Sequence, residues 1–154
     1  MTLETGDKAP GFKLPADGDR ECDLADYKGK PVVLYFYPRD DTPGCTTEAQ
    51  GFRDALPEFE KCGAAVIGVS RDTVKKHDRF KDKHDLNFPL IADVDGELCE
   101  KYGVWVEKKN YGRTYMGIER STFLIGNDGK LRQIWRKVRV KGHVDAVLEA
   151  VREL

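Results

Sequence analysis

Cys45 is the residue of this 154-residue chain whose position most favours chemistry. It follows a tight turn, residues 38–44, between an apolar run at residues 30–37 and a segment compatible with a helix. The first amides of a helix have no partner within the helix and lie at the positive end of its dipole. A thiol in that first turn is stabilised as the thiolate, the nucleophilic form of cysteine. The pattern therefore predicts a nucleophilic thiol at the carboxyl end of a buried strand, where sites tend to form in open α/β sheets.

The turn before the cysteine offers groups that suit attack of a thiolate on a peroxide oxygen. Such attack needs hydrogen-bond donors for the charge that develops on the departing oxygen. Thr42 supplies a hydroxyl one helical turn before the sulfur, and Gly44 and Cys45 supply backbone amides. Pro38 and Tyr37 are expected to form an apolar rim that keeps water sparse.

A cation that would hold the thiolate is not provided by the turn itself. Arg39 is adjacent in sequence but is expected to point outwards. Arg120 is the better candidate, provided that the strand expected over residues 121–125 lies beside the strand that precedes the turn. Glu48 lies one turn further along the same helix. It either tunes the site through hydrogen bonds or is a plain surface carboxylate.

Alternating apolar runs and helix-compatible segments indicate an α/β fold in one domain, residues 1–154. Two βα units, a hairpin and a closing helix predict a central mixed β-sheet with helices on both faces, which is the thioredoxin-like arrangement. Asp72 is the expected N-cap of the second helix. Strands are expected over residues 30–37, 64–70, 88–92, 121–125 and 130–135. Helices are expected from residue 45 to a close at Gly63, weakened or kinked by Gly51 and Pro57, and over residues 72–83, 97–102 and 143–154.

Charge and composition exclude several other classes of function. The chain has 26 Lys and Arg against 27 Asp and Glu, a net charge of −1, which gives no indication of nucleic acid or of an anionic membrane surface. The basic run at residues 136–141 alternates, and we interpret it as a strand end with one solvated face. The amino terminus of the chain lacks the pattern of a signal peptide, and no apolar run is long enough to span a membrane, so a cytoplasmic protein is expected. The three histidines, His77, His84 and His143, stand among charged residues and are expected at the surface.

The motif Pro38-x-x-x-Thr42-x-x-Cys45 resembles the peroxiredoxin signature, and the stretch YFYPRDDTPGCTTEA resembles the peroxiredoxin Q group, or bacterioferritin-comigratory proteins. The resemblance continues in GVSRD at residues 68–72, YGVW at residues 102–105 and YGRTYMGIERSTFLI at residues 111–125. It implies that Arg120 is the active-site arginine. It also implies reduction of hydrogen peroxide and organic hydroperoxides without a metal or organic cofactor, and recycling by thioredoxin or a related thiol donor. Many relatives are monomers, so a monomer is expected, with a weak dimer as the alternative.

The resemblance fails at the second thiol of the cycle. The sulfenic acid formed on the first cysteine must be resolved by another thiol. Gln50 and Lys81 occupy the two positions where relatives carry a resolving cysteine. Cys99 is the best remaining candidate, Cys62 is expected at the end of the first helix, and Cys22 in an amino-terminal strand. We therefore predict a one-cysteine cycle with an external thiol, and an atypical two-cysteine cycle through Cys99 is the alternative.

Two further interpretations compete with a peroxidase. A disulfide oxidoreductase on the same fold would normally carry C-x-x-C, but Thr42 stands three residues before Cys45. A non-catalytic binding or chaperone-like module could use the same fold. The joint presence of Thr42, Cys45 and Arg120 argues against that second alternative.

Overall fold

The computed structural model describes residues 2–154. Its strands are β1 (Lys13–Ala16), β2 (Arg20–Asp23), β3 (Val32–Phe36), β4 (Ala65–Ser70), β5 (Leu90–Ala92), β6 (Trp105–Asn110), β7 (Arg113–Ile118), β8 (Ser121–Ile125) and β9 (Leu131–Trp135). Its α-helices are α1 (Pro43–Lys61), α2 (Val74–His84), α3 (Glu97–Lys101) and α4 (His143–Arg152), and 3₁₀ turns occupy Asp17–Asp19 and Leu24–Tyr27. No helix in residues 2–154 has the length and apolarity needed to cross a membrane.

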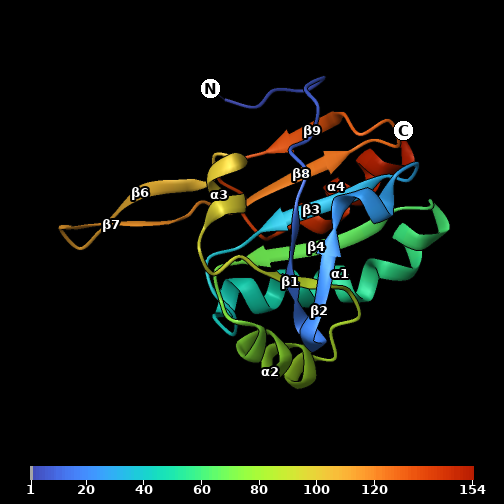
Figure 1. Ribbon diagram of the computed structural model, residues 1–154. Helices are drawn as coiled ribbons and strands as arrows, with labels where there is room; N and C mark the ends of the chain where they lie inside the picture. The colour runs from blue at the N-terminus through green and yellow to red at the C-terminus, as the bar shows by residue number, and fades with distance from the viewer. Residues whose placement is uncertain (1) are drawn as a thin grey trace.

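A mixed seven-stranded sheet in the order β2-β1-β5-β4-β3-β8-β9 forms the body of the molecule (Figure 1). β3 lies near its centre, and all five of its residues are buried, which explains its β-branched and aromatic composition. β3 pairs in parallel with β4 and antiparallel with β8. The predicted strands around Cys45 are therefore confirmed, and the strand next to Arg120 does lie beside β3.

Two apolar clusters cover the two faces of the sheet. On one face the side chains of α1, α2 and α4 pack against Val33, Tyr35 and Leu124. On the other face α3 and the amino-terminal segment pack against Leu34, Phe36 and other alternate residues of the same strands. The expectation of helices on both faces is confirmed, and α1 and α4 lie on the same face, where both pack against the sheet.

Helix α1 begins at Pro43 and continues through Gly51 and Pro57 to Lys61, so it ends at Cys62 as the sequence predicted. Proline has no amide hydrogen, so Pro57 leaves the carbonyl of Arg53 without its helical partner. The side chain of Asn87 donates to this carbonyl at 3.3 Å and replaces the lost hydrogen bond. Gly51 is accommodated because a Cβ there would lie 2.9 Å from Val144 on α4. Both helix-weakening residues thus have a local structural reason.

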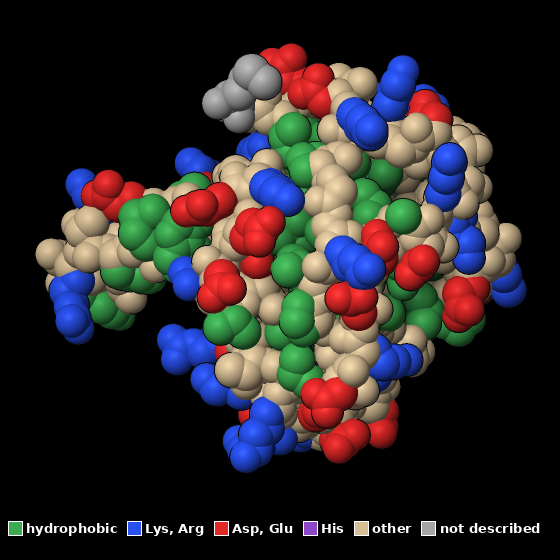
Figure 2. Space-filling view, in the orientation of Figure 1, with side chains coloured by type: hydrophobic (Ala, Val, Ile, Leu, Met, Phe, Trp, Pro, Cys, Tyr) green, Lys and Arg blue, Asp and Glu red, His purple; other side chains and the backbone are tan. Residues whose placement is uncertain are grey.

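The hairpin of β6 and β7 was not predicted. It projects from the body as a two-stranded arm, and Tyr111 and Gly112 form its turn with φ angles of 50° and 76° (Figure 1). Apolar side chains gather along this arm in the space-filling view (Figure 2), and Tyr115 and Met116 are about half exposed. At its base the chain passes through Glu119 and Arg120 and returns to the sheet at β8, so Arg120 lies between the arm and the sheet.

Two local predictions are wrong. The N-cap of α2 is Thr73, whose hydroxyl accepts a hydrogen bond from the amide of Lys76 at 3.2 Å, and it is not Asp72. Asp72 instead accepts from the Ser70 hydroxyl within the turn after β4. The basic run at residues 136–141 is not a strand end, because β9 stops at Trp135 and Lys137 has a positive φ of 49°.

Candidate functional site

Cys45 is the third residue of α1, in the first helical turn as the sequence predicted. Its side chain is buried, with 1% of the residue exposed. The Nη2 group of Arg120 donates to its sulfur at 3.4 Å. The thiol therefore faces both the positive end of a helix and a guanidinium group, two features that stabilise a thiolate.

Arg120 reaches the cysteine from the junction between β7 and β8. Ser121, the next residue, pairs with Phe36 at the end of β3, so Arg120 lies beside the turn that leads to α1. Gly44 leaves room for it, because a Cβ at that position would lie 3.1 Å from Arg120 Nη2. Arg39 is exposed, as the sequence indicated. The cation at the sulfur is thus Arg120, and it comes from outside the turn that precedes Cys45.

Glu48 fixes the other half of the guanidinium group. Arg120 Nη1 donates to Glu48 Oε1 at 2.7 Å, and Glu48 is fully buried, so it is not a surface carboxylate of the helix. Burial raises the pKa of Glu48 to about 7, although the neighbouring Arg120 opposes this shift. Burial lowers the pKa of Arg120, but Glu48 and Cys45 together raise it above its ordinary value, so Arg120 remains a cation. The guanidinium is held between a carboxyl group and a sulfur.

Thr42 and Pro38 lie on the open side of the site. Thr42 is the N-cap of α1, and its hydroxyl donates to the carbonyl of Arg39 at 2.9 Å, which leaves its oxygen lone pairs as acceptors. Both residues line a groove bordered by the β6–β7 arm. Tyr37 does not form part of the rim. It is buried behind the turn, and its hydroxyl donates to Asp40 at 2.5 Å.

Two of the three histidines are buried rather than on the surface. His77 is fully buried, with Nδ1 2.7 Å from Asp40 Oδ2 and Nε2 2.9 Å from the carbonyl oxygen of Ile91. His143 is 6% exposed and lies 2.7 Å from the Thr122 hydroxyl. Burial lowers the pKa of His143 to about 4, with a smaller contribution from Arg120. Both histidines lie on the buried face of their helices. Their neighbours in the sequence are charged, and for that reason the sequence predicted a surface position.

Asp40, Asp72 and His77 bring three potential metal ligands together. Their polar atoms are already used within the protein. Both nitrogens of His77 face acceptors, while Asp72 Oδ2 accepts from the Ser70 hydroxyl and the Asp40 amide. A metal needs an imidazole lone pair, which a nitrogen that donates its proton cannot offer. This donor set does not fit a metal ion.

The other cysteines are far from Cys45 in the fold, and all four carry free thiols. Cys22 in β2 and Cys99 in α3 belong to the apolar cluster on the opposite face of the sheet. Cys62 follows the last residue of α1, about 25 Å along the helix from Cys45 at a rise of 1.5 Å per residue. Burial and the nearby Asp93 raise the pKa of Cys99, and burial raises that of Cys22 to about 11. The expected positions of Cys22 and Cys62 are confirmed.

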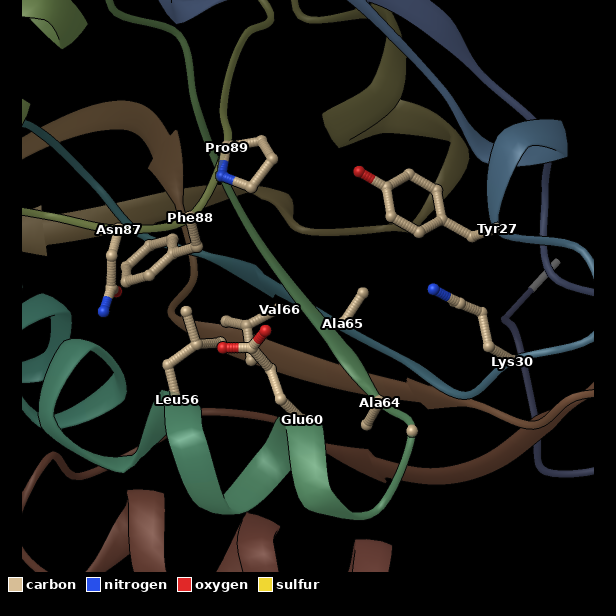
Figure 3. A pocket seen from close by; sticks show the side chains of 11 residues that line it. Tyr27, Lys30, Leu56, Glu60, Ala64, Ala65, Val66, Asn87, Phe88 and Pro89 are labelled. Atoms are coloured by element: carbon tan, nitrogen blue, oxygen red, sulfur yellow. The ribbon is translucent and has the colours of Figure 1, made fainter.

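A separate pocket lies at the amino end of β4, away from Cys45 (Figure 3). Apolar residues of α1 and the segment before β5 form its wall, and Tyr27, Lys30 and Glu60 lie around it. It contains neither a cysteine nor a histidine. The chemistry-bearing residues thus converge at the carboxyl end of β3 and not at this pocket.

Comparison with known proteins identifies the family. Residues 5–134 match the model of the AhpC/TSA family. The chain belongs to this family. It is 52% identical over 154 residues to peroxiredoxin Bcp of Bacillus subtilis, an alignment that covers 100% of this chain and 98% of the relative. The peroxiredoxin Bcp of Escherichia coli is 44% identical over 151 residues, covering 98% and 97% of the two chains.

Solved structures that resemble this chain belong to the same group of proteins. The bacterioferritin comigratory protein of Xanthomonas campestris, described for its alkyl peroxide reduction activity, matches with a TM-score of 0.88 and 48% identity, covering 92% of this chain and 90% of that chain. A cysteine variant of PrxQ from Xylella fastidiosa matches with a TM-score of 0.94 and 42% identity over 99% and 98% of the two chains. The thioredoxin-like peroxiredoxin fold is therefore confirmed, and the chain is a thiol-dependent peroxidase of the Bcp and PrxQ group.

Glu48→Gln tests the buried carboxyl group without changing its shape. The pKa of Glu48 rises from 4.5 to about 7 on folding, mainly because of burial, so the folded protein holds a proton that the unfolded chain releases. Stability from this group is therefore present below pH 4.5 and is lost as pH rises towards 7. We expect urea unfolding to show Glu48→Gln gaining on the order of 3 kcal/mol relative to the parent protein across this window.

Glu60→Gln is the control for loss of a carboxylate, since Glu60 is an exposed residue of the same helix. A stability difference between Glu48→Gln and the parent that stays constant from pH 4.5 to 8 would contradict the assignment.

Proposed function

We propose that Cys45 is the peroxidatic cysteine and that Arg120 is the group that activates it and the bound peroxide. The observation that carries this proposal is the 3.4 Å contact between Arg120 Nη2 and the Cys45 sulfur. Glu48 holds the same guanidinium through Nη1, so the direction of Nη2 is fixed before any substrate arrives. Preorganised charge of this kind is the largest single contribution in many enzyme sites.

The chemical step follows from the groups around the sulfur. The Cys45 thiolate attacks one oxygen of a hydroperoxide, the O–O bond breaks, and a bond forms between sulfur and oxygen to give a sulfenic acid. The other oxygen departs as an alkoxide or hydroxide, which Arg120 and the amides of Gly44 and Cys45 stabilise until a proton from water neutralises it. Thr42 accepts a hydrogen bond from the peroxide O–H, because its own proton is committed to the Arg39 carbonyl.

Hydrogen peroxide and organic hydroperoxides are the proposed substrates. The groove lined by Pro38 and Thr42 continues towards Trp105, Met116 and Ile118 of the arm, which gives an alkyl group an apolar surface next to the turn that precedes Cys45. The Xanthomonas campestris relative is described for alkyl peroxide reduction, which supports the organic class.

The proposed cycle uses one cysteine and an external thiol such as thioredoxin. A disulfide requires Cα atoms within about 7 Å, and Cys99 packs on the far side of the sheet from Cys45. The external thiol attacks the sulfenic acid and releases water, and a second thiol then frees Cys45 as the reductant becomes a disulfide. The atypical two-cysteine cycle through Cys99 is the alternative that must be tested.

We also infer a monomer made of one domain and a reducing, cytoplasmic setting. Cys45, Thr42, Glu48 and Arg120 all come from one chain, so the site needs no second copy. Four free thiols and a dependence on an external thiol suit a compartment that keeps cysteines reduced.

Arg120→Ala tests the proposed activation. Removing one charge-stabilising donor typically lowers a rate by about 10²- to 10³-fold, so we expect that loss in the second-order rate of peroxide reduction, measured by stopped flow. Arg120→Lys should rescue only part of the rate, since an ammonium cannot contact the sulfur and Glu48 as a fork.

Cys45→Ser should abolish turnover, and Arg39→Ala, in the exposed part of the turn, is the matched control that should retain most of the rate. Near-parental rates in Arg120→Ala would remove Arg120 from the mechanism, and turnover by Cys45→Ser would remove the proposed nucleophile.

Cys99→Ser separates the one-cysteine cycle from its alternative. We expect full turnover with thioredoxin and its reductase, because the buried Cys99 thiol is not needed. Intact mass after one equivalent of hydrogen peroxide should show oxidised Cys45 and no internal disulfide. If turnover collapses while the single-turnover burst of peroxide consumption survives, Cys99 is the resolving thiol and the one-cysteine cycle is wrong.

A further inference from the structure

Helix α2 holds the turn that leads to the site cysteine. His77 contacts Asp40 at 2.7 Å inside the protein, while Lys83 and His84 contact Asp41 at 2.8 and 3.0 Å on the surface. Asp41 itself has a positive φ of 61°, a backbone conformation that costs energy for a residue with a side chain. External contacts must therefore keep the turn in this shape.

The His77–Asp40 pair is the buried one of these contacts. The side chain of His77 is 0% exposed and that of Asp40 is 6% exposed. The second nitrogen of His77 lies 2.9 Å from the Ile91 carbonyl, which can only accept a hydrogen bond. The other oxygen of Asp40, Oδ1, accepts a hydrogen bond from the Tyr37 hydroxyl. An imidazole between a carbonyl and a carboxylate satisfies both only when each ring nitrogen carries a proton, so the geometry calls for an imidazolium.

The surroundings of His77 favour this cation. Burial alone lowers the pKa of His77, but the hydrogen bond and charge of Asp40, the Ile91 carbonyl and the charge of Asp72 raise it above 6.5. Burial raises the pKa of Tyr37 well above 10, so its hydroxyl remains a donor to Asp40. Asp40 from the turn, Asp72 from the turn before α2 and Tyr37 at the end of β3 are the titratable groups that face the ring.

We propose that His77 is a positioning residue of the peroxidase site, whose imidazolium fastens Asp40, and with it the turn that ends at Cys45, onto α2 and β5. This proposal rests on the proposed role of Cys45. With the pair intact, the turn keeps Thr42 beside the first helical residues and Cys45 against Arg120. When the pair is broken, the turn opens and the buried sulfur becomes accessible to an external thiol.

The proposal has a defined pH direction. A histidine whose pKa is raised on folding by its partners contributes its full effect below the unfolded value of 6.5, and this effect is lost as pH rises through the folded value. Protection of the turn against opening should therefore decline from pH 6.5 upwards in the parent protein.

The protonation state can be observed directly. In ¹⁵N-labelled parent protein at pH 6, both ring nitrogens of His77 should have the NMR shifts of protonated imidazolium nitrogens. An unprotonated ring nitrogen on His77 at this pH would overturn the proposal. The measurement needs no peroxide, so it is independent of whether Cys45 is the nucleophile.

Variants connect the pair to the site. In His77→Gln, and equally in Asp40→Asn, hydrogen exchange of the Asp40 and Thr46 amides, which donate to Asp72 and to the Thr42 carbonyl, should be at least about tenfold faster at pH 6 after correction for its intrinsic pH dependence, and should lose its pH trend. Reduction of oxidised Cys45 by dithiothreitol should accelerate, while the peroxide step should slow by at least about tenfold, since small displacements of reacting groups cost rate. The double variant should show no further effect, because both changes break one interaction.

Two controls separate positioning from general stability. Val66→Ala shortens a core side chain in β4 on the strand's amino-terminal half, and Lys75→Gln changes an exposed residue of α2. Neither should move the two steps of the cycle in opposite directions. If the Asp40 and Thr46 amides of folded His77→Gln exchange at the parental rate, the proposal fails. If those amides exchange faster but peroxide is reduced at the same rate as in the parent protein, His77 holds the turn without positioning the site, and the proposal fails as well.

Discussion

The guanidinium of Arg120, held between the Cys45 sulfur and the Glu48 carboxyl group, is the interaction on which the arrangement of this protein depends. Its side chain is only 16% exposed, and removing such charges from water is costly unless their partners are well placed. The first two turns of α1, which carry Cys45 and Glu48, must therefore meet the residue that precedes β8. The antiparallel pairing of β8 with β3 brings them together, and the missing side chain of Gly44 allows the close approach.

The sheet separates the thiols by chemistry as well as by distance. Cys45 packs on the face covered by α1 and α4, whereas Cys22 and Cys99 pack on the other face. The thiol pKa of Cys99 is raised by burial and by Asp93, whose carboxylate accepts from the Cys99 amide at 2.8 Å. A neutral buried thiol is a poor nucleophile, so the fold itself opposes a second reactive cysteine on that face.

Much of this could be predicted from the sequence because the signals were local. Unbroken apolar runs gave β3 and β4, and the turn composition put Cys45 in the first helical turn. The arm was missed because β6 and β7 are mostly polar and bury little, although Gly112 in a two-residue turn is a typical hairpin signal. His77 was misplaced because its partner lies 37 residues earlier. The spacing of His77 and Phe80, three residues apart on the buried face of α2, was the only local indication.

The burial of Cys45, the proposed nucleophile, creates a conflict that the turn before α1 must resolve. With 1% of Cys45 exposed, a thiol on a protein partner cannot come within bonding distance of the sulfur without displacement of the turn. Opening of this turn breaks few backbone hydrogen bonds, because the first amides of α1 have no partners within the helix. The barrier then comes from side chains, chiefly Arg120 on the sulfur and the contacts of α2 with Asp40 and Asp41. The same contacts that orient the thiolate for the first half of the reaction must therefore yield in the second half, and their strength sets the balance between the two.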